Sequence, residues 1–133
     1  MTSVISDLLA ELAETLDRTT RVRVFDSVGP GEPTRKRRNR PPALADQHDP
    51  EALMQLRAAL APRPDSKIMA WMQWPDLWLE LLGHDHARLT TIGLLRPGWL
   101  RLEVNGDLEL RNPKAIVQWL TRWAPTAAAS IAE

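Results

Sequence analysis

Apolar residues in the first part of the chain recur with the period of a helix. Between residues 3 and 17 they fall on one stripe, and acidic residues occupy the opposite side. This spacing predicts an amphipathic helix over residues 3–17, capped by Thr2 or Ser3. Basic and apolar residues then alternate over residues 21–25, which predicts a short strand near the edge of a sheet. The helical stripe consists of Ile5, Leu8, Leu9, Leu12 and Leu16.

A second helix is predicted by its start signal as well as by its period. Asp49, Pro50 and Glu51 supply an N-cap, a first helical residue and a first-turn acid, and leucines follow at helical spacing. We expect this helix to end before Pro62. The preceding residues, 27–48, are rich in proline, glycine and basic residues, and we expect them to form a long mobile loop. The leucines of the helix are Leu53, Leu56 and Leu60.

From residue 67 onward the apolar residues alternate with a period of two, which is typical of strands. The intervening turns contain Pro, Gly, Asp or Asn, the residues that favour tight reversals. Short connections favour antiparallel pairing between successive strands, so the pattern predicts a meander. The predicted strands are residues 67–73, 77–82, 87–95, 99–104 and 107–111.

A final helix is predicted after the strands. Asn112 is followed by proline, which repeats the cap signature of the second helix. Trp119 and Trp123 are in phase with the isoleucine and leucine of this helix, so we expect both in the core or at its edge. Residues 125–133 are rich in alanine, and we expect them to fray.

These elements predict an α+β fold in a single domain that covers residues 1–133. The sheet would be an antiparallel meander of about five to six strands, with the helices packed on one of its faces. A chain of 133 residues with 44% hydrophobic content is of the size that builds one core.

Alternation along the strands also separates the two faces of the predicted sheet. One face is almost entirely leucine and isoleucine and would pack against the helices. The other mixes tryptophan with charged residues, and because exposed tryptophan is costly we interpret that face as a contact surface for a partner protein. Alternatively, the first helix, the long loop or a second copy of the chain covers these tryptophans. The candidate partner-binding residues are Trp71, Trp78, Glu80, Trp99, Arg101 and Glu103.

Composition removes several classes of function. The chain has no cysteine, which excludes disulfides, thiolate catalysis and cysteine-ligated metal sites. Its 17 basic and 17 acidic residues balance, so no overall field attracts nucleic acid or an anionic membrane. No apolar stretch is long enough to span a membrane, and the N-terminal residues do not resemble a signal peptide. We therefore expect a cytoplasmic protein.

The sequence offers one candidate for metal binding and no recognisable cofactor motif. His84, Asp85 and His86 place two imidazoles and a carboxylate in one predicted turn. A metal site needs three or four converging ligands, so we favour a solvated polar turn. Phosphate-binding loops, zinc-protease motifs and nucleophile elbows are absent, and we expect neither a cofactor nor a metal.

Carboxylates on the tryptophan-bearing face are the only other candidates for catalysis. Glu80, Glu103 and Glu109 would form an acid–base pair if two of them converged. We favour charge pairs with Arg101 and Arg111 on neighbouring strands, and we assign no catalytic residue.

A run of basic residues in the long loop is the strongest charge signal. It could bind the phosphates of nucleic acid, although it contains no aromatic residue for stacking on bases. It could equally fold back on the acidic remainder of the chain or keep the loop solvated. We expect deletion of residues 30–42 to leave the thermal stability nearly unchanged. The run consists of Arg35, Lys36, Arg37, Arg38 and Arg40.

The order of elements resembles that of small single-domain proteins from bacteria with GC-rich genomes, for which no activity is assigned. The resemblance covers residues 20–123 and rests on the Asp49–Pro50 cap with its leucines, on residues 75–81 and on residues 108–120. Such proteins often carry Cys-x-Cys and His-His-Gly motifs near the first two hairpins, and this chain has neither. The resemblance therefore implies a fold and no activity.

The sequence leaves three functions open. The preferred one is a non-enzymatic module of the immunity, adaptor or regulatory type that binds a protein through the tryptophan-bearing face, or that associates with itself. The second is a small-ligand-binding or hydrolytic domain that uses the same face as the floor of a pocket. The third is nucleic-acid binding through the basic loop.

Overall fold

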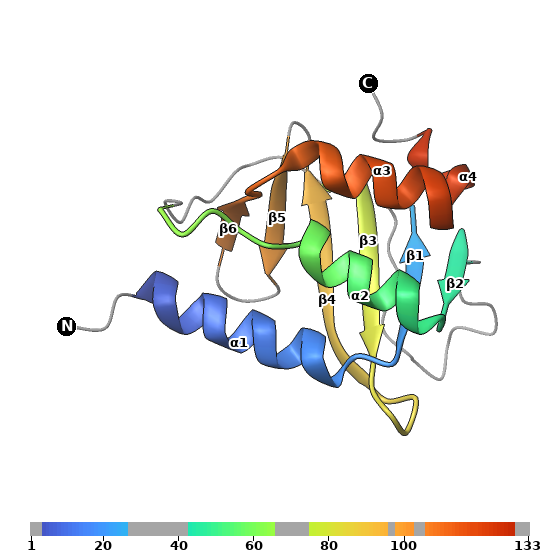
Figure 1. Ribbon diagram of the computed structural model, residues 1–133, viewed down its shortest axis with the longest axis horizontal. Coiled ribbons are helices and arrows are strands. Elements are labelled where there is room, and N and C mark those ends of the chain that lie inside the picture. The colour runs from blue at the N-terminus through green and yellow to red at the C-terminus, as the bar shows by residue number, and fades with distance from the viewer. Residues whose placement is uncertain (1–3, 27–42, 66–74, 96–97, 103–105, 130–133) are drawn as a thin grey trace, which may run out of the picture.

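The computed structural model describes residues 4–26, 43–65, 75–95, 98–102 and 106–129, with the side chains of the first helix described from Asp7 onward. This part of the chain forms four helices and six strands (Figure 1). In order they are α1 (Val4–Arg18), β1 (Arg21–Phe25), β2 (Ala45–Gln47), α2 (Pro50–Ala59), β3 (Leu77–Leu82), β4 (Arg88–Leu95), β5 (Trp99–Leu102), β6 (Gly106–Glu109), α3 (Pro113–Trp123) and α4 (Pro125–Ala128).

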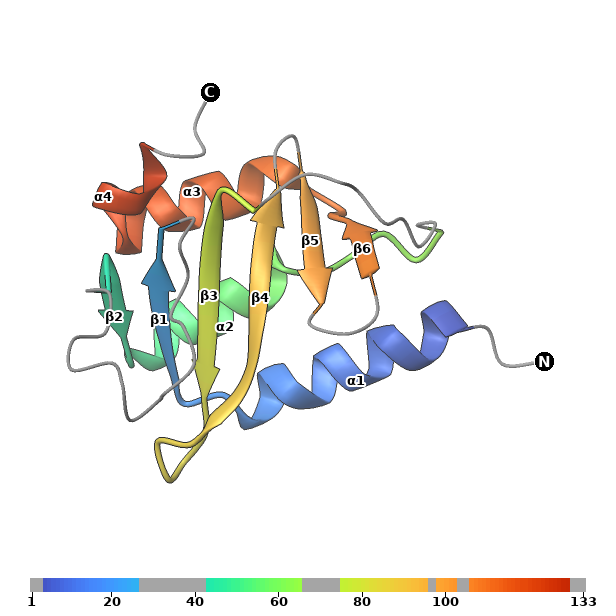
Figure 2. The same cartoon turned by 180° about the vertical axis from the view of Figure 1, so that it is seen from behind.

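The six strands form one antiparallel sheet in the order β2-β1-β3-β4-β5-β6. Strands β3 to β6 follow one another as the predicted meander, and β1 and β2 extend it beyond β3. Helices α1, α2 and α3 lie on one side of this sheet in Figure 1, and Figure 2 shows the sheet from the opposite side. The α+β fold with an antiparallel sheet is therefore confirmed.

The core lies between the sheet and the helices. Side chains at alternate strand positions point into it, as the period of two predicts. Leu8, Leu12 and Leu16 of α1 cover the same layer, because residues four apart lie on one face of a helix. The strands contribute Val22, Val24, Leu77, Leu79, Leu81, Ile92, Leu94, Leu100 and Leu108, all of which are buried.

Helix α2 is held against α3 by two tryptophans. Trp119 is 3% exposed, and its indole N–H donates a hydrogen bond to the carbonyl oxygen of Ala52 at 2.8 Å. Trp123 lies at the edge of the core and donates to Oε1 of Gln55 at 3.0 Å. Both positions confirm the expectation drawn from their phase in the helix.

The two predicted N-caps differ in the bonds that they make. Asp49 caps α2, since its carboxylate accepts a hydrogen bond from the N–H of Glu51 at 2.8 Å. Asn112 occupies the N-cap position of α3, but its side chain makes no capping hydrogen bond. Its backbone, with φ of −138° and ψ of 92°, differs from that of Asp49, with φ of −67° and ψ of 126°. The predicted position was therefore right and the predicted bond was wrong.

Two short elements correct the sequence analysis. Residues 45–47, at the end of the predicted loop, form β2 and pair with β1. Residues 125–128, in the predicted frayed tail, form α4, and Ala127 and Ala128 are buried there. The predicted strand at 67–73 and the residues of the basic run lie outside the described residues, as do the last residues of the strand predicted to end at 104.

Candidate protein-binding face

The sheet face opposite the helices brings together side chains from several strands. Register places Trp78 of β3 beside Gly93 of β4, Gly93 beside Arg101 of β5, and Arg101 beside Asp107 of β6. Residues paired in register share a face, so Trp78, Arg101 and Asp107 form one row across the sheet. Glu80 lies in the next row, where it pairs with Arg23 of β1 and Thr91 of β4.

Glu80 lies at the centre of an ion-pair cluster. Its side chain is only 2% exposed, and its Oε2 accepts a hydrogen bond from Nε of Arg88 at 2.9 Å. Nη2 of the same guanidinium lies 2.8 Å from this oxygen. Nη1 of Arg23 lies 3.6 Å from the other oxygen, Oε1. A buried carboxylate must be neutralised by cations, and these two arginines supply the charge.

A second ion pair lies toward β6. Arg101 donates from Nε and Nη2 to the two carboxylate oxygens of Asp107, at 2.8 Å and 3.2 Å. The hydrogen bond to Asp107 raises the pKa of Arg101 above its ordinary value, and burial opposes this effect. The Asp107 side chain is 1% exposed, while that of Arg101 is 23% exposed.

The two clusters share one arrangement: the carboxylates are buried near the sheet, and the guanidinium groups that pair with them are partly exposed to solvent. Arg23 and Arg88 are 25% and 23% exposed, whereas Glu80 beneath them is almost fully buried. Solvent on this face therefore meets arginine rather than the carboxylate that neutralises it.

At the sheet edge, Arg21 of β1 forms a bidentate pair with Asp46 of β2. The hydrogen bond from Arg21 lowers the pKa of Asp46 below its usual range, although burial partly opposes it. The same bond raises the pKa of Arg21. This ion pair ties the short edge strand β2 to its neighbour.

Trp78 and Trp99 lie on this face and are partly buried. Gly93 makes room beside Trp78: a Cβ atom there would lie 2.7 Å from Cγ of Pro75 and 3.3 Å from the Trp78 ring. Pro75 and Trp78 thus pack directly on the backbone of β4. Trp99 pairs with Glu109 in register, nearer the end of the sheet.

The structure thus places Trp78, Glu80, Trp99 and Arg101 on one face, as the parity of their strands predicts. Trp71 and Glu103, the other two candidate residues, lie outside the described residues.

Glu80 is charge-paired with neighbouring strands, as expected, but its partners are not the arginines that were expected, and Glu103 lies outside the described residues. Glu80 pairs with Arg88 and Arg23, and Glu109 lies 3.7 Å from the guanidinium of Arg63. Neither pair involves the expected Arg101 or Arg111, because parity assigns a face to a residue but no neighbour across the sheet.

Three residues that build this face are not among the candidates predicted from sequence. Asp107 has the parity of Glu109, which was already assigned to this face, and Arg23 alternates with the apolar Val22 and Val24, so alternation alone could have found both. Arg88 has the opposite parity within its own strand. The register shifts between Leu81 and Leu82, and this irregularity brings Arg88 to the side of Glu80.

In the turn between β3 and β4, residues 84–87 are exposed to solvent. Asp85 accepts a hydrogen bond from the N–H of Ala87 at 3.1 Å, and His86 has a left-handed backbone with φ of 64°. These features are typical of a tight turn, in which Asp supplies the local bond. Within the described ranges, no group of three or more His, Asp or Glu residues is arranged to hold a metal ion.

Comparison of the chain with protein-family models, with curated proteins and with solved structures found no match in any of the three. The resemblance inferred from the order of elements therefore stays a prediction. Among the described helices, none has the length and apolar character needed to cross a membrane.

Proposed function

We propose that the chain is a non-enzymatic protein-binding module that uses the sheet face opposite the helices. Its partner would be a protein segment that carries carboxylates next to an apolar side chain. The observation that supports this proposal is the difference in exposure within the ion pairs: Arg23, Arg88 and Arg101 remain partly exposed, whereas Glu80 and Asp107 are buried.

The residue types of this face are those that dominate binding at protein interfaces. Tryptophan and arginine are enriched among the residues whose truncation weakens a complex most. Arg88 and Arg101 are held in place before any partner arrives, because each donates hydrogen bonds to a buried carboxylate. A side chain that is already ordered loses less entropy on binding.

The sign of the exposed charge selects the partner. Arg88 and Arg101 donate N–H groups to buried carboxylates, and the parts of Arg23, Arg88 and Arg101 that solvent reaches carry positive charge. Acidic side chains of a partner suit these positions, and an apolar side chain between them can pack against Trp99. Such an interface should weaken as salt is added.

Use of the same face as the floor of a ligand pocket has less support. Pro75 packs over Gly93, at the centre of the face, and so occupies the space beside the Trp78 ring. Nucleic-acid binding through residues 35–40 stays a prediction, because those residues lie outside the described part of the chain.

The proposal can be tested with a phage-displayed library of random peptides selected on the immobilised chain. We expect the selected peptides to contain Asp or Glu beside an apolar residue. A synthetic copy of one such peptide should bind about 30-fold more weakly to Trp99→Ala, which corresponds to the roughly 2 kcal/mol of a hot-spot residue.

Met54→Ala, on the helical side, is the matched control and should bind the peptide as the wild type does. Replacing the acidic residues of the peptide with Asn or Gln should weaken binding to the wild type. Selected peptides without carboxylates, or equal binding by Trp99→Ala and wild type, would count against the proposal.

A further inference from the structure

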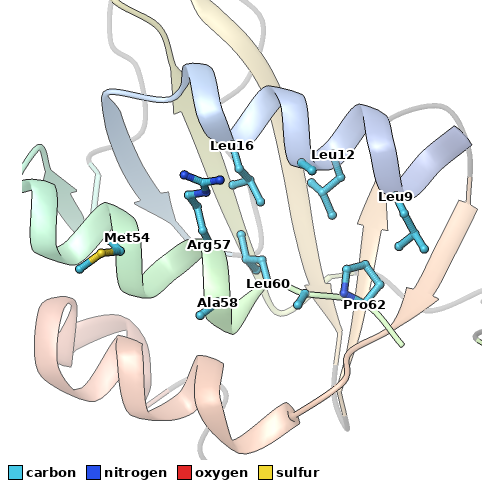
Figure 3. A pocket seen from close by; sticks show the side chains of 10 residues that line it. Leu9, Leu12, Leu16, Met54, Arg57, Ala58, Leu60 and Pro62 are labelled. Carbon is cyan, nitrogen blue, oxygen red and sulfur yellow. The ribbon is translucent and has the colours of Figure 1, made fainter. Parts of the chain in front are cut away.

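The helical side of the molecule has an apolar centre. Met54 of α2 is 65% exposed, which makes it the one large apolar side chain that stands out among the described residues. Ala58, one turn further along α2, is also exposed. A groove of about 480 Å³ lies between these residues of α2 and the helix α1 (Figure 3). It is lined by Leu9, Leu12, Leu16, Met54, Leu60 and Pro62, among others.

The helices on either side of this centre carry opposite charge. Helix α1 has four acidic residues and one basic residue among those described, all exposed. Helix α3 contains Lys114 and Arg122 and no acidic residue, and the exposed Arg111 precedes it. Helix α2 is neutral, with Glu51 and Arg57. The charged residues of α1 are Asp7, Glu11, Glu14, Asp17 and Arg18.

The order of the three helices across the sheet follows from their contacts. Arg57 of α2 forms an ion pair with Asp17 at the end of α1. On its other side, α2 accepts the hydrogen bond from Trp119, and Glu51 lies 3.5 Å from Arg122. Helix α2 therefore lies between the acidic and the basic helix, as Figure 1 shows.

We propose that this helical face binds a second copy of the chain about a twofold axis that runs along α2. A twofold axis in the plane of the interface exchanges the two sides of the face. The acidic α1 of one copy then faces the basic α3 of the other, twice in each dimer. Met54 and Ala58 lie near the axis, where the small Ala58 side chain lets the two α2 helices approach.

The charge order favours a second copy over an unrelated partner. A face that is apolar in the middle, acidic on one side and basic on the other is complementary to itself under this rotation. A rotation about an axis perpendicular to α2 would instead bring α1 against α1, and like charges would oppose it. The charges thus specify the axis as well as the face.

The first test is the oligomeric state, measured by sedimentation equilibrium over a range of concentrations. We expect a monomer–dimer equilibrium in the wild type that shifts toward monomer as salt is added. Met54→Asp should raise the dissociation constant by about 100-fold or more, because it places a charge at the centre of the interface. Ala58→Arg provides a second variant at the same centre.

Ala87→Asp is the matched control, since Ala87 is exposed in the turn between β3 and β4. It should dimerise as the wild type does. Circular dichroism and thermal melting of each variant would show that it is folded. A wild type that stays monomeric at millimolar concentration, or a dimer that survives both substitutions on α2, would overturn the proposal.

The second test concerns the axis and uses charge reversal. One variant carries Asp7→Lys with Glu14→Lys on α1, and the other carries Arg111→Glu with Lys114→Glu beside and on α3. Each alone should dimerise at least about tenfold more weakly, because like charges then face each other on both sides of the axis.

An equimolar mixture of the two variants should restore the dimer, as a mixed species seen by native mass spectrometry. In that species the reversed α1 faces the reversed α3, and the two unchanged helices also face each other. If the mixture stays as weak as the separate variants, α1 does not face α3 and the proposed axis is wrong.

Discussion

The carboxylate of Glu80 lies between two arginines with only 2% of its side chain exposed. Burying a charge is unfavourable unless it is paired, so Glu80, Arg88 and Arg23 depend on one another. Removing the carboxylate would leave the two guanidinium groups close together without their counter-charge. Loss of any one of these residues would therefore destabilise the folded protein, because the remaining charges would stay buried without a counter-charge.

We expect Glu80→Ala to lower the free energy of unfolding by about 3 kcal/mol or more, as is usual when one partner of a buried ion pair is lost. Urea denaturation followed by circular dichroism would measure the change. Glu51→Ala is the control, because Glu51 lies 3.5 Å from Arg122 in an exposed pair, and we expect it to cost less than about 1 kcal/mol. Equal effects would show that burial of Glu80 is not what matters.

At the scale of elements, the two proline-started helices allow a direct comparison of caps. The Asp49 carboxylate accepts a hydrogen bond from Glu51, whereas the side chain of Asn112 makes no capping bond. Asp49→Ala should lower the free energy of unfolding by about 1 kcal/mol. Asn112→Ala should have a clearly smaller effect in the same urea experiment, and a similar loss for both would mean that Asn112 also caps its helix in solution.

Strand β2 depends on an ion pair whose strength changes with pH. Because Arg21 lowers the pKa of Asp46 in the folded protein, the unfolded chain binds that proton more tightly. The stabilisation is therefore complete above the ordinary Asp value of about 3.9 and is lost as pH falls through the lower folded value.

Asp46→Asn removes this contribution. The difference in unfolding free energy between wild type and variant should be largest near neutral pH and should shrink in acid, as measured by urea denaturation at several pH values. A difference that stays constant across this range would mean that the ion pair does not stabilise the folded state.

Strong periodic patterns predicted the larger elements, and the shortest elements escaped them. Helix α1 and strand β3 repeat their period often enough to be read from sequence. Strand β2 has three residues and α4 has four, too few to show a period, and β2 is held by pairing and by the Asp46 ion pair. Such pairing with a strand that is distant in the sequence leaves no signal in the local pattern of residues.

For the candidate face, the sequence predicted which residues lie on it but not which charges pair there. Parity assigned Trp78, Trp99 and Arg101 to the face opposite the helices, since alternation requires only the local chain. The partners of its charges could not be predicted, because they depend on register across strands. Arg88 reaches Glu80 only through the irregularity in the pairing of β3 with β4.

At the scale of the whole molecule, the sheet separates two surfaces of different character. The helical side has apolar side chains at its centre and opposite charges at its margins. The other side presents arginine above buried carboxylates. A surface used for self-association and a surface used for a partner can therefore act without competing, because the sheet lies between them (Figures 1 and 2).

This separation leads to a prediction that joins the two proposals. A dimer formed through the helical faces would carry its two partner-binding faces on opposite outer surfaces. Each would bind the acidic peptide independently in solution, so Met54→Asp and wild type should have the same affinity for the free peptide in a calorimetric titration. The self-association of the chain would then change only binding to a multivalent target.

On a sensor surface coated densely with that peptide through a flexible matrix, one dimer can bind two peptides. The second binding event is then intramolecular. We expect the wild type to dissociate at least about tenfold more slowly than Met54→Asp from the dense surface. The two proteins should dissociate at equal rates from a sparsely coated surface, which serves as the control. Trp99→Ala should bind neither surface well. Equal dissociation from the dense surface, by a wild type shown to be dimeric, would mean that the dimer does not present both sheet faces outward.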